Sequence, residues 1–85
     1  MRNFKTLYAW QKSHEFILEI YRTTQDFPSE EKYGLTSQIR RAATSIALNI
    51  AKGCGRRTEK EFTNFLNISF GSCCEVEYAI CYARI

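Results

Sequence analysis

The sequence predicts an all-α protein, an up-down antiparallel helical bundle that forms a single domain over residues 1–85. Three long segments repeat their apolar residues at steps of three and four, which places those residues on one face of a helix. Helix-breaking sequences separate the three segments. The first connection, of about seven residues, has the length that joins antiparallel neighbours in a bundle.

The first helix is expected over residues 6–25. Its apolar face consists of six residues at helical spacing: Leu7, Trp10, His14, Ile17, Leu18 and Tyr21. We interpret His14, the only histidine, as a core residue with a satisfied ring nitrogen and not as a catalytic base, because no nucleophile lies near it in the sequence. Asp26-Phe27-Pro28 ends the helix, because proline cannot continue the hydrogen-bond ladder and disfavours helical backbone in the residue before it.

The second helix occupies most of residues 33–58, the stretch around which the rest of the chain is organised. Its predicted buried face consists of Leu35, Ile39, Ala42, Ala43, Ile46 and Ile50. A second line, Arg41, Ser45, Leu48 and Lys52, lies on the far side. We expect the helix to end near Lys52, because Gly53 suits the left-handed conformation that often closes helices.

The third helix begins at a predicted capping box, in which Thr58 and Glu61 each satisfy the other's backbone amide. One face is marked by Phe62, Phe65, Leu66, Ser69, Cys73, Val76, Ile80 and Ala83. Much of the remainder is apolar as well, through Ile68, Phe70, Cys74, Tyr78, Cys81 and Tyr82. A helix that is apolar nearly all round is expected to be buried on more than one side. No stop signal precedes Ile85, so we expect the chain to be truncated within this helix and to lack a partner helix.

The net charge of +3 conceals a strongly basic middle. Residues 34–60 contain one acidic side chain, Glu59, and six basic ones: Arg40, Arg41, Lys52, Arg56, Arg57 and Lys60. Such a local excess favours anionic partners, so these six are the candidate nucleic-acid-binding residues. The alternative, that the charges form an ordinary solvated helix face, stays open at this point.

Composition indicates self-association. The chain is 45% apolar and 14% aromatic, although a lone domain of this size buries only about 60 to 65% of its unfolded surface. Cys54, Cys73, Cys74 and Cys81 show no CxxC or Cys/His ligand spacing, so we interpret them as reduced, small core residues and expect no metal and no disulfide. No membrane-spanning run or secretory signal is recognisable, which predicts a cytoplasmic protein without a membrane partner.

Three blocks of sequence resemble a known family: LYAWQKSHEFILEIY (7–21), YGLTSQIRRAATSIALNIAKGCGR (33–56) and EFTNFLNISFGSCCEVE (61–77). They are similar to the four-helix-bundle proteins encoded in intervening sequences of 23S ribosomal RNA genes, which are similar in turn to the accessory variability determinant of diversity-generating retroelements. The resemblance implies a ring-shaped homopentamer with no enzymatic activity and no cofactor. It also implies RNA or DNA and a reverse transcriptase as partners, since the retroelement relatives bind these through basic surfaces.

The chain departs from the family pattern at three points. The fourth helix of the family is missing. Where the family usually reads SIPSNIAEG, residues 45–53 read SIALNIAKG, so Ala47 replaces a proline and Lys52 replaces an acid. The usual ARGS reads SFGS at residues 69–72, which removes a basic residue from the third helix.

These features leave three functions to compare. The first is a non-enzymatic homo-oligomer that binds nucleic acid without strong sequence specificity, because no helix-turn-helix or other sequence-reading motif is recognisable. The second is a structural or protein-interaction module in which the arginines provide solubility or intersubunit ion pairs. An enzyme is disfavoured, because His14 and Asp26 are about three helical turns apart and cannot share a proton. Salt dependence of binding separates the first two.

Overall fold

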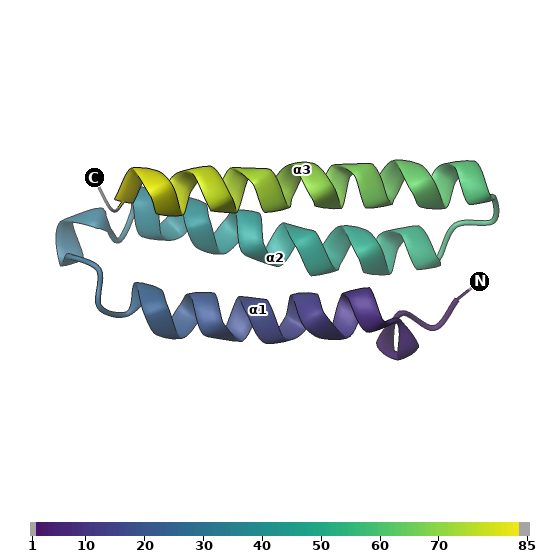
Figure 1. Ribbon diagram of the computed structural model, residues 1–85, viewed down its shortest axis with the longest axis horizontal. Helices are drawn as coiled ribbons and strands as arrows, with labels where there is room; N and C mark the ends of the chain where they lie inside the picture. Colours follow the sequence, from purple (N-terminus) through teal and green to yellow (C-terminus); the bar gives the residue numbers. More distant parts are fainter. Residues whose placement is uncertain (1, 84–85) are drawn as a thin grey trace.

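Three long helices lie side by side in antiparallel order: α1 (Tyr8–Thr24), α2 (Leu35–Cys54) and α3 (Glu59–Ala83) (Figure 1). The computed structural model describes residues 2–83. Two short 3-10 helices, η1 (Phe4–Thr6) and η2 (Ser29–Glu31), precede α1 and α2. The described part of the chain measures 43 × 19 × 18 Å along its principal axes. The predicted all-α, up-down arrangement is therefore confirmed for these residues.

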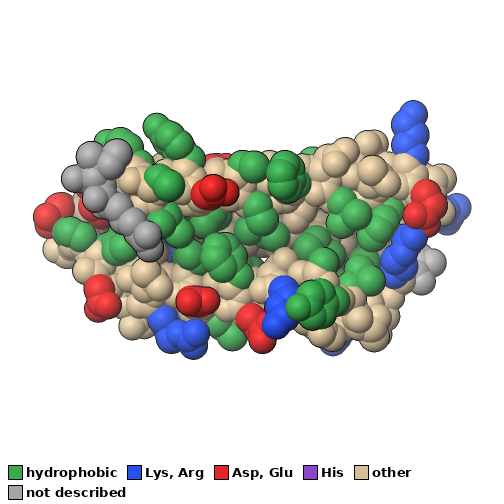
Figure 2. Space-filling view, in the orientation of Figure 1, with side chains coloured by type: hydrophobic (Ala, Val, Ile, Leu, Met, Phe, Trp, Pro, Cys, Tyr) green, Lys and Arg blue, Asp and Glu red, His purple; other side chains and the backbone are tan. Residues whose placement is uncertain are grey.

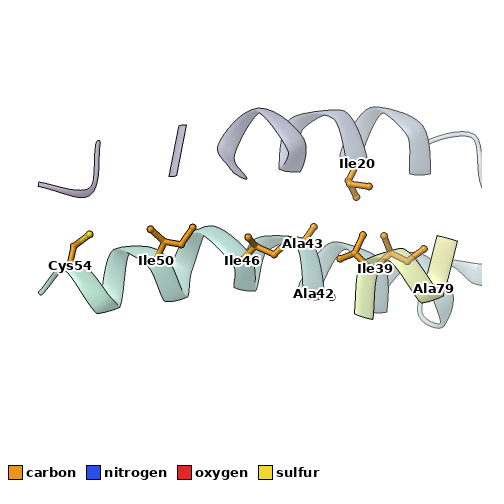
Figure 3. Packing of buried hydrophobic residues seen from close by; sticks show 9 residues of the cluster. Ile20, Ile39, Ala42, Ala43, Ile46, Ile50, Cys54 and Ala79 are labelled. Carbon is orange, nitrogen blue, oxygen red and sulfur yellow. The ribbon is translucent and has the colours of Figure 1, made fainter. Parts of the chain in front are cut away.

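Helix α2 is the centre of the bundle. Both α1 and α3 pack closely against it, whereas the backbones of α1 and α3 do not approach each other in the part of the chain that the structure describes, and these two helices meet only through side chains such as Ile20 and Ala79. The predicted face of α2 supplies most of the core, and Figure 3 shows its side chains together with Ile20 of α1 and Ala79 of α3. The core cluster consists of Ile20, Ile39, Ala42, Ala43, Ile46, Ile50, Cys54, Val76 and Ala79.

Helix α1 begins at Tyr8 and not at Thr6, because the residues before it form η1. The side chain of Asn3 accepts a hydrogen bond from the Lys5 amide (3.1 Å), and the Thr6 hydroxyl donates to the Asn3 carbonyl (2.8 Å). The helix ends at Thr24, close to the predicted end. Only Ile20 and Thr24 are buried along it, since the backbone of α1 approaches only that of α2 among the three long helices.

Helix α2 ends at Cys54, two residues beyond the predicted end near Lys52. The prediction of a left-handed Gly53 is wrong, because no glycine among residues 2–83 has a positive φ. Gly53 lies buried inside the helix, where an added Cβ would be 3.0 Å from the Cβ of Phe65 and 3.2 Å from Cδ1 of Phe62. Glycine therefore serves the close approach of α2 and α3, and not the termination of the helix.

Helix α3 begins with the predicted cap in modified form. The Glu61 amide donates to the Thr58 hydroxyl (3.1 Å), as a capping box requires. The second half differs, because the Thr58 hydroxyl donates to the Glu61 carboxylate (3.0 Å). Farther along, hydroxyl groups hold α3 to α2: Ser69 Oγ donates to the Ile46 carbonyl (2.6 Å), and Ser72 Oγ lies 3.0 Å from Ser45 Oγ.

The outer side of α3 stays apolar and exposed. Phe70 is 70% exposed and Tyr78 72% exposed, and Ile68 and Tyr82 are exposed as well. Contacts within residues 2–83 therefore do not bury this helix on more than one side. The expected truncation at Ile85 lies outside the described residues. None of the helices in the described range is long and apolar enough to cross a membrane.

Candidate nucleic-acid interface

Four of the six predicted basic residues come together at one end of the molecule. Lys52 lies in the last turn of α2, Arg56 and Arg57 in the turn that follows, and Lys60 in the first turn of α3. All four are exposed. In Figure 2, blue side chains gather at the end where the α2–α3 turn lies in Figure 1. We call this group, together with Arg2, the basic end.

Arg2 joins the basic end because the amino-terminal segment folds back onto the α2–α3 turn. Its amide donates to the Cys54 carbonyl (3.0 Å), and its guanidinium lies 3.9 Å from the centre of the Phe62 ring and pairs with Glu59. Arg2 was not among the predicted residues, because residues 1–33 are neutral as a segment. Only the fold-back, a long-range contact, brings this charge to the others.

The cations of the basic end differ in how firmly they are held. Arg56 lies 4.7 Å above the Phe65 ring, a cation–π contact that orients the guanidinium without neutralising it. Within residues 2–83, the ion pairs found join Arg2 to Glu59 and Lys12 to Glu15, so Arg57 and Lys60 have none. Glu59 is paired and Glu61 caps α3. The surface is therefore left with a positive excess.

Arg40 lies elsewhere and has a structural role. Twelve residues of helix separate it from Lys52, which is about 18 Å. Its Nε donates to the Thr24 hydroxyl (2.8 Å), and its terminal nitrogen donates to the Tyr21 carbonyl (3.2 Å). The guanidinium also lies 4.4 Å from the Tyr21 ring. A cation bonded to a carbonyl in the last turn of α1 satisfies an orphan acceptor and complements the helix dipole.

Arg41 is also separate from the basic end. It lines a groove of about 600 Å³ between α2 and α3, together with Ser37, Ser45, Ser72 and the carboxylate of Glu75. Arg41 is exposed, but an acidic side chain lines the same groove. Arg40 and Arg41 are adjacent in sequence, yet the 100° step of a helix sends their side chains to different surfaces.

The histidine prediction is wrong. His14 is exposed, and its ring stacks on that of Trp10 with centroids 5.1 Å apart and an interplanar angle of 7°. The apolar face of α1 is wider than the surface that α2 covers, so residues at its edge remain outside the core.

The cysteines likewise differ from the prediction. Cys54 is buried in the core, as expected, but Cys73, Cys74 and Cys81 are exposed, because α3 contacts a single long helix. Partial burial, followed by the neighbouring Cys74 and Glu77, raises the pKa of the Cys73 thiol. This thiol therefore stays protonated at neutral pH and is not an activated nucleophile. No group of three or more metal-binding side chains occurs in the described part of the chain.

Comparison with known proteins identifies the family. A family model described as 23S rRNA-intervening sequence protein matches residues 5–85, which include all three long helices. The family description names no enzymatic reaction. A search of curated proteins finds no match.

Proposed function

We propose that this chain, which belongs to the 23S rRNA-intervening sequence protein family, is a non-enzymatic homo-oligomer that binds nucleic acid through its basic end. The observation that carries the proposal is the convergence of Arg2, Lys52, Arg56, Arg57 and Lys60 on one end of the bundle. Lysine and arginine side chains that neutralise phosphates release counterions, which supplies most of the affinity of non-specific nucleic-acid binding.

Local backbone geometry supports an anion at the same place. The α2–α3 turn ends at the amino terminus of α3, where the helix dipole favours negative charge. Arg57 directly precedes Thr58 at this terminus, and Lys60 lies in the first turn. These contacts recognise phosphate and not base edges, so we expect binding without strong sequence specificity.

Self-association is the second part of the proposal. A bundle that leaves Phe70, Tyr78 and Tyr82 exposed on one helix gains by covering them with further copies of the chain. Repetition of the basic end around a closed assembly would also raise the effective concentration of cations along one nucleic acid. The homopentamer, the retroelement relation and a reverse transcriptase partner rest on the resemblance and remain predictions, as does the cytoplasmic location expected from the sequence.

The runner-up function is a structural or protein-interaction module. The exposed apolar side of α3 favours it, because such a surface suits a partner protein as well as another copy. In that case Arg2 and Arg56 would act mainly through their contacts with the Phe62 and Phe65 rings. The two functions predict different nucleic-acid affinities when the charges of Arg57 and Lys60 are reversed.

Reversal of the charges of Arg57 and Lys60 tests the proposal of nucleic-acid binding. The double variant R57E/K60E is expected to bind mixed RNA and DNA at least about tenfold more weakly, because two phosphate contacts per chain are replaced by repulsion. The slope of log affinity against log salt should fall by roughly 1 to 2. Fluorescence anisotropy of labelled oligonucleotides between about 50 and 200 mM salt measures both quantities.

The matched control is R22E/K32E, which makes the same change in net charge at exposed positions away from the basic end. It should keep the affinity and the salt slope, and thermal melts should show that both double variants fold. If R57E/K60E retains nucleic acid like the wild type but dissociates the oligomer, the module function replaces the proposal.

Self-association is tested at Phe70. The variant F70S is expected to shift a concentration-dependent assembly toward monomer, because a covered phenylalanine contributes about 1.5 to 3 kcal/mol. Light scattering during size-exclusion chromatography measures the mass, and circular dichroism checks the fold. The control N67S changes an exposed polar residue of the same helix. A wild-type chain that is folded and monomeric at high concentration would contradict the oligomer.

A further inference from the structure

We propose that Phe4, Trp10 and His14 form a base-stacking platform beside the basic end, which makes the protein prefer single-stranded over duplex nucleic acid. This inference rests on the proposed function, because it concerns which nucleic acid the basic end holds. We define the aromatic platform as these three rings.

The three rings form one continuous aromatic cluster, in which Trp10 and His14 are stacked and Phe4 meets Trp10 edge-on. Trp10 and His14 are four residues apart on α1, so they lie one above the other on the same side of the helix. Their planes are nearly parallel, at 7°, and Phe4 meets Trp10 edge-on with centroids 5.0 Å apart and an angle of 64°. Phe4 and Trp10 also pack against the core, which fixes the stack, whereas His14 is exposed.

The platform and the cations are joined through the amino-terminal segment. Phe4 follows Arg2 by two residues, so their Cα atoms are at most about 7 Å apart. Arg2 is itself anchored on Cys54, Glu59 and Phe62 at the basic end. In Figure 1 the N terminus and the start of α1 lie at the same end of the bundle as the α2–α3 turn. A strand whose phosphates contact the cations therefore has its bases near the rings.

Binding by charge and binding by stacking predict opposite preferences between duplex and single-stranded nucleic acid. A duplex has the higher charge density, so a purely cationic surface favours duplex or does not discriminate. Paired bases are already stacked in a duplex and cannot offer their faces to a protein ring, whereas bases of a single strand can. Stacking on an aromatic side chain strengthens binding by roughly 5- to 150-fold per base. Tighter binding of the single strand than of the duplex would therefore indicate stacking on the platform.

Trp10 is the only tryptophan, so its fluorescence reports the platform directly. The full-length chain is titrated with oligothymidine and with a mixed-sequence duplex of the same length, at one salt concentration. We expect the single strand to quench Trp10 emission and to bind at least about fivefold more tightly than the duplex, and the duplex to leave the emission unchanged. Anisotropy of labelled strands gives both affinities.

Three variants separate stacking from charge. H14A is expected to weaken single-strand binding at least about fivefold and to leave duplex binding unchanged. H14F should restore it, because phenylalanine keeps a ring without a titratable group. The matched control is Y33A, which removes an exposed ring before α2, at the far end of the bundle from the α2–α3 turn; it should change neither affinity.

The outcomes distinguish the two proposals. Equal affinities, a preference for duplex, equal quenching by both ligands, or H14A with unchanged single-strand binding would overturn the platform while the basic end remains a nucleic-acid interface. The failure of both ligands to bind would overturn the platform and the proposed function together.

Discussion

The variant I39A is expected to lose about 2 to 5 kcal/mol of the free energy of unfolding, the range for removing most of a buried isoleucine. Ile39 is fully buried, with 0% of its surface exposed. It belongs to the part of the core to which Ile20 of α1 and Ala79 of α3 contribute (Figure 3). A domain of this length has a total stability of roughly 4 to 13 kcal/mol, so the loss is a large fraction of the whole.

Urea unfolding followed by circular dichroism measures this loss at a chain concentration low enough to limit assembly. The control I68A removes the same atoms from α3 at a position that is 52% exposed. It should cost less than about 1 kcal/mol, because most of that surface is already in water. Equal losses in I39A and I68A would mean that α2 is not the centre of the core.

Most of the buried face of α2 could be predicted from the sequence, because this helix lies between the other two. A helix with neighbours on two sides needs a wide, regular apolar band, and a regular band is what helical periodicity detects. Five of the six predicted residues, Ile39, Ala42, Ala43, Ile46 and Ile50, are buried, and Leu35 at the start of the helix is half-buried. The family assignment, which rested on three blocks of sequence within residues 7–77, is confirmed by the match over residues 5–85.

The outer helices could not be predicted as well. Periodicity gives the direction of an apolar face but not how much of it a neighbour covers. His14 and Leu18 lie on the predicted face of α1, and Cys73 on that of α3, yet all three are exposed. Within the described range, the backbone of each of these helices approaches only that of α2 among the long helices, so the edges of its face meet solvent.

In the candidate interface too, the positions that depend on sequence neighbours could be predicted, whereas those that depend on long-range contacts could not. Lys52, Arg56, Arg57 and Lys60 are close in sequence across one turn, so their grouping in space follows from the helix boundaries. The distance of Arg40 from them also follows from the length of the helix, but its structural role became visible only through its hydrogen bonds to Thr24 and Tyr21. The addition of Arg2 depends on the fold-back of the amino terminus, which no local pattern encodes.

The second large effect is expected at Gly53. The variant G53A should lose about 1 to 3 kcal/mol of the free energy of unfolding, the usual cost of inserting a methyl group into a packed contact. The new Cβ would lie 3.0 Å from the Cβ of Phe65 and 3.4 Å from the backbone oxygen of Phe62. Neither atom can rotate away, because both are fixed by the α3 backbone. The two helices must therefore move apart, which also loosens the packing around Cys54.

The control G71A makes the same substitution inside α3, where an added Cβ meets nothing within 4 Å. Alanine is favoured over glycine inside a helix by about 0.8 to 1.0 kcal/mol, so G71A should be more stable than the wild type. Helix propensity acts equally at both positions, and only the contact with Phe62 and Phe65 differs. If denaturant unfolding shows that G53A lowers the free energy of unfolding and G71A raises it, the difference is due to the contact with Phe62 and Phe65. Stabilisation by both variants would mean that α2 and α3 can separate at no cost.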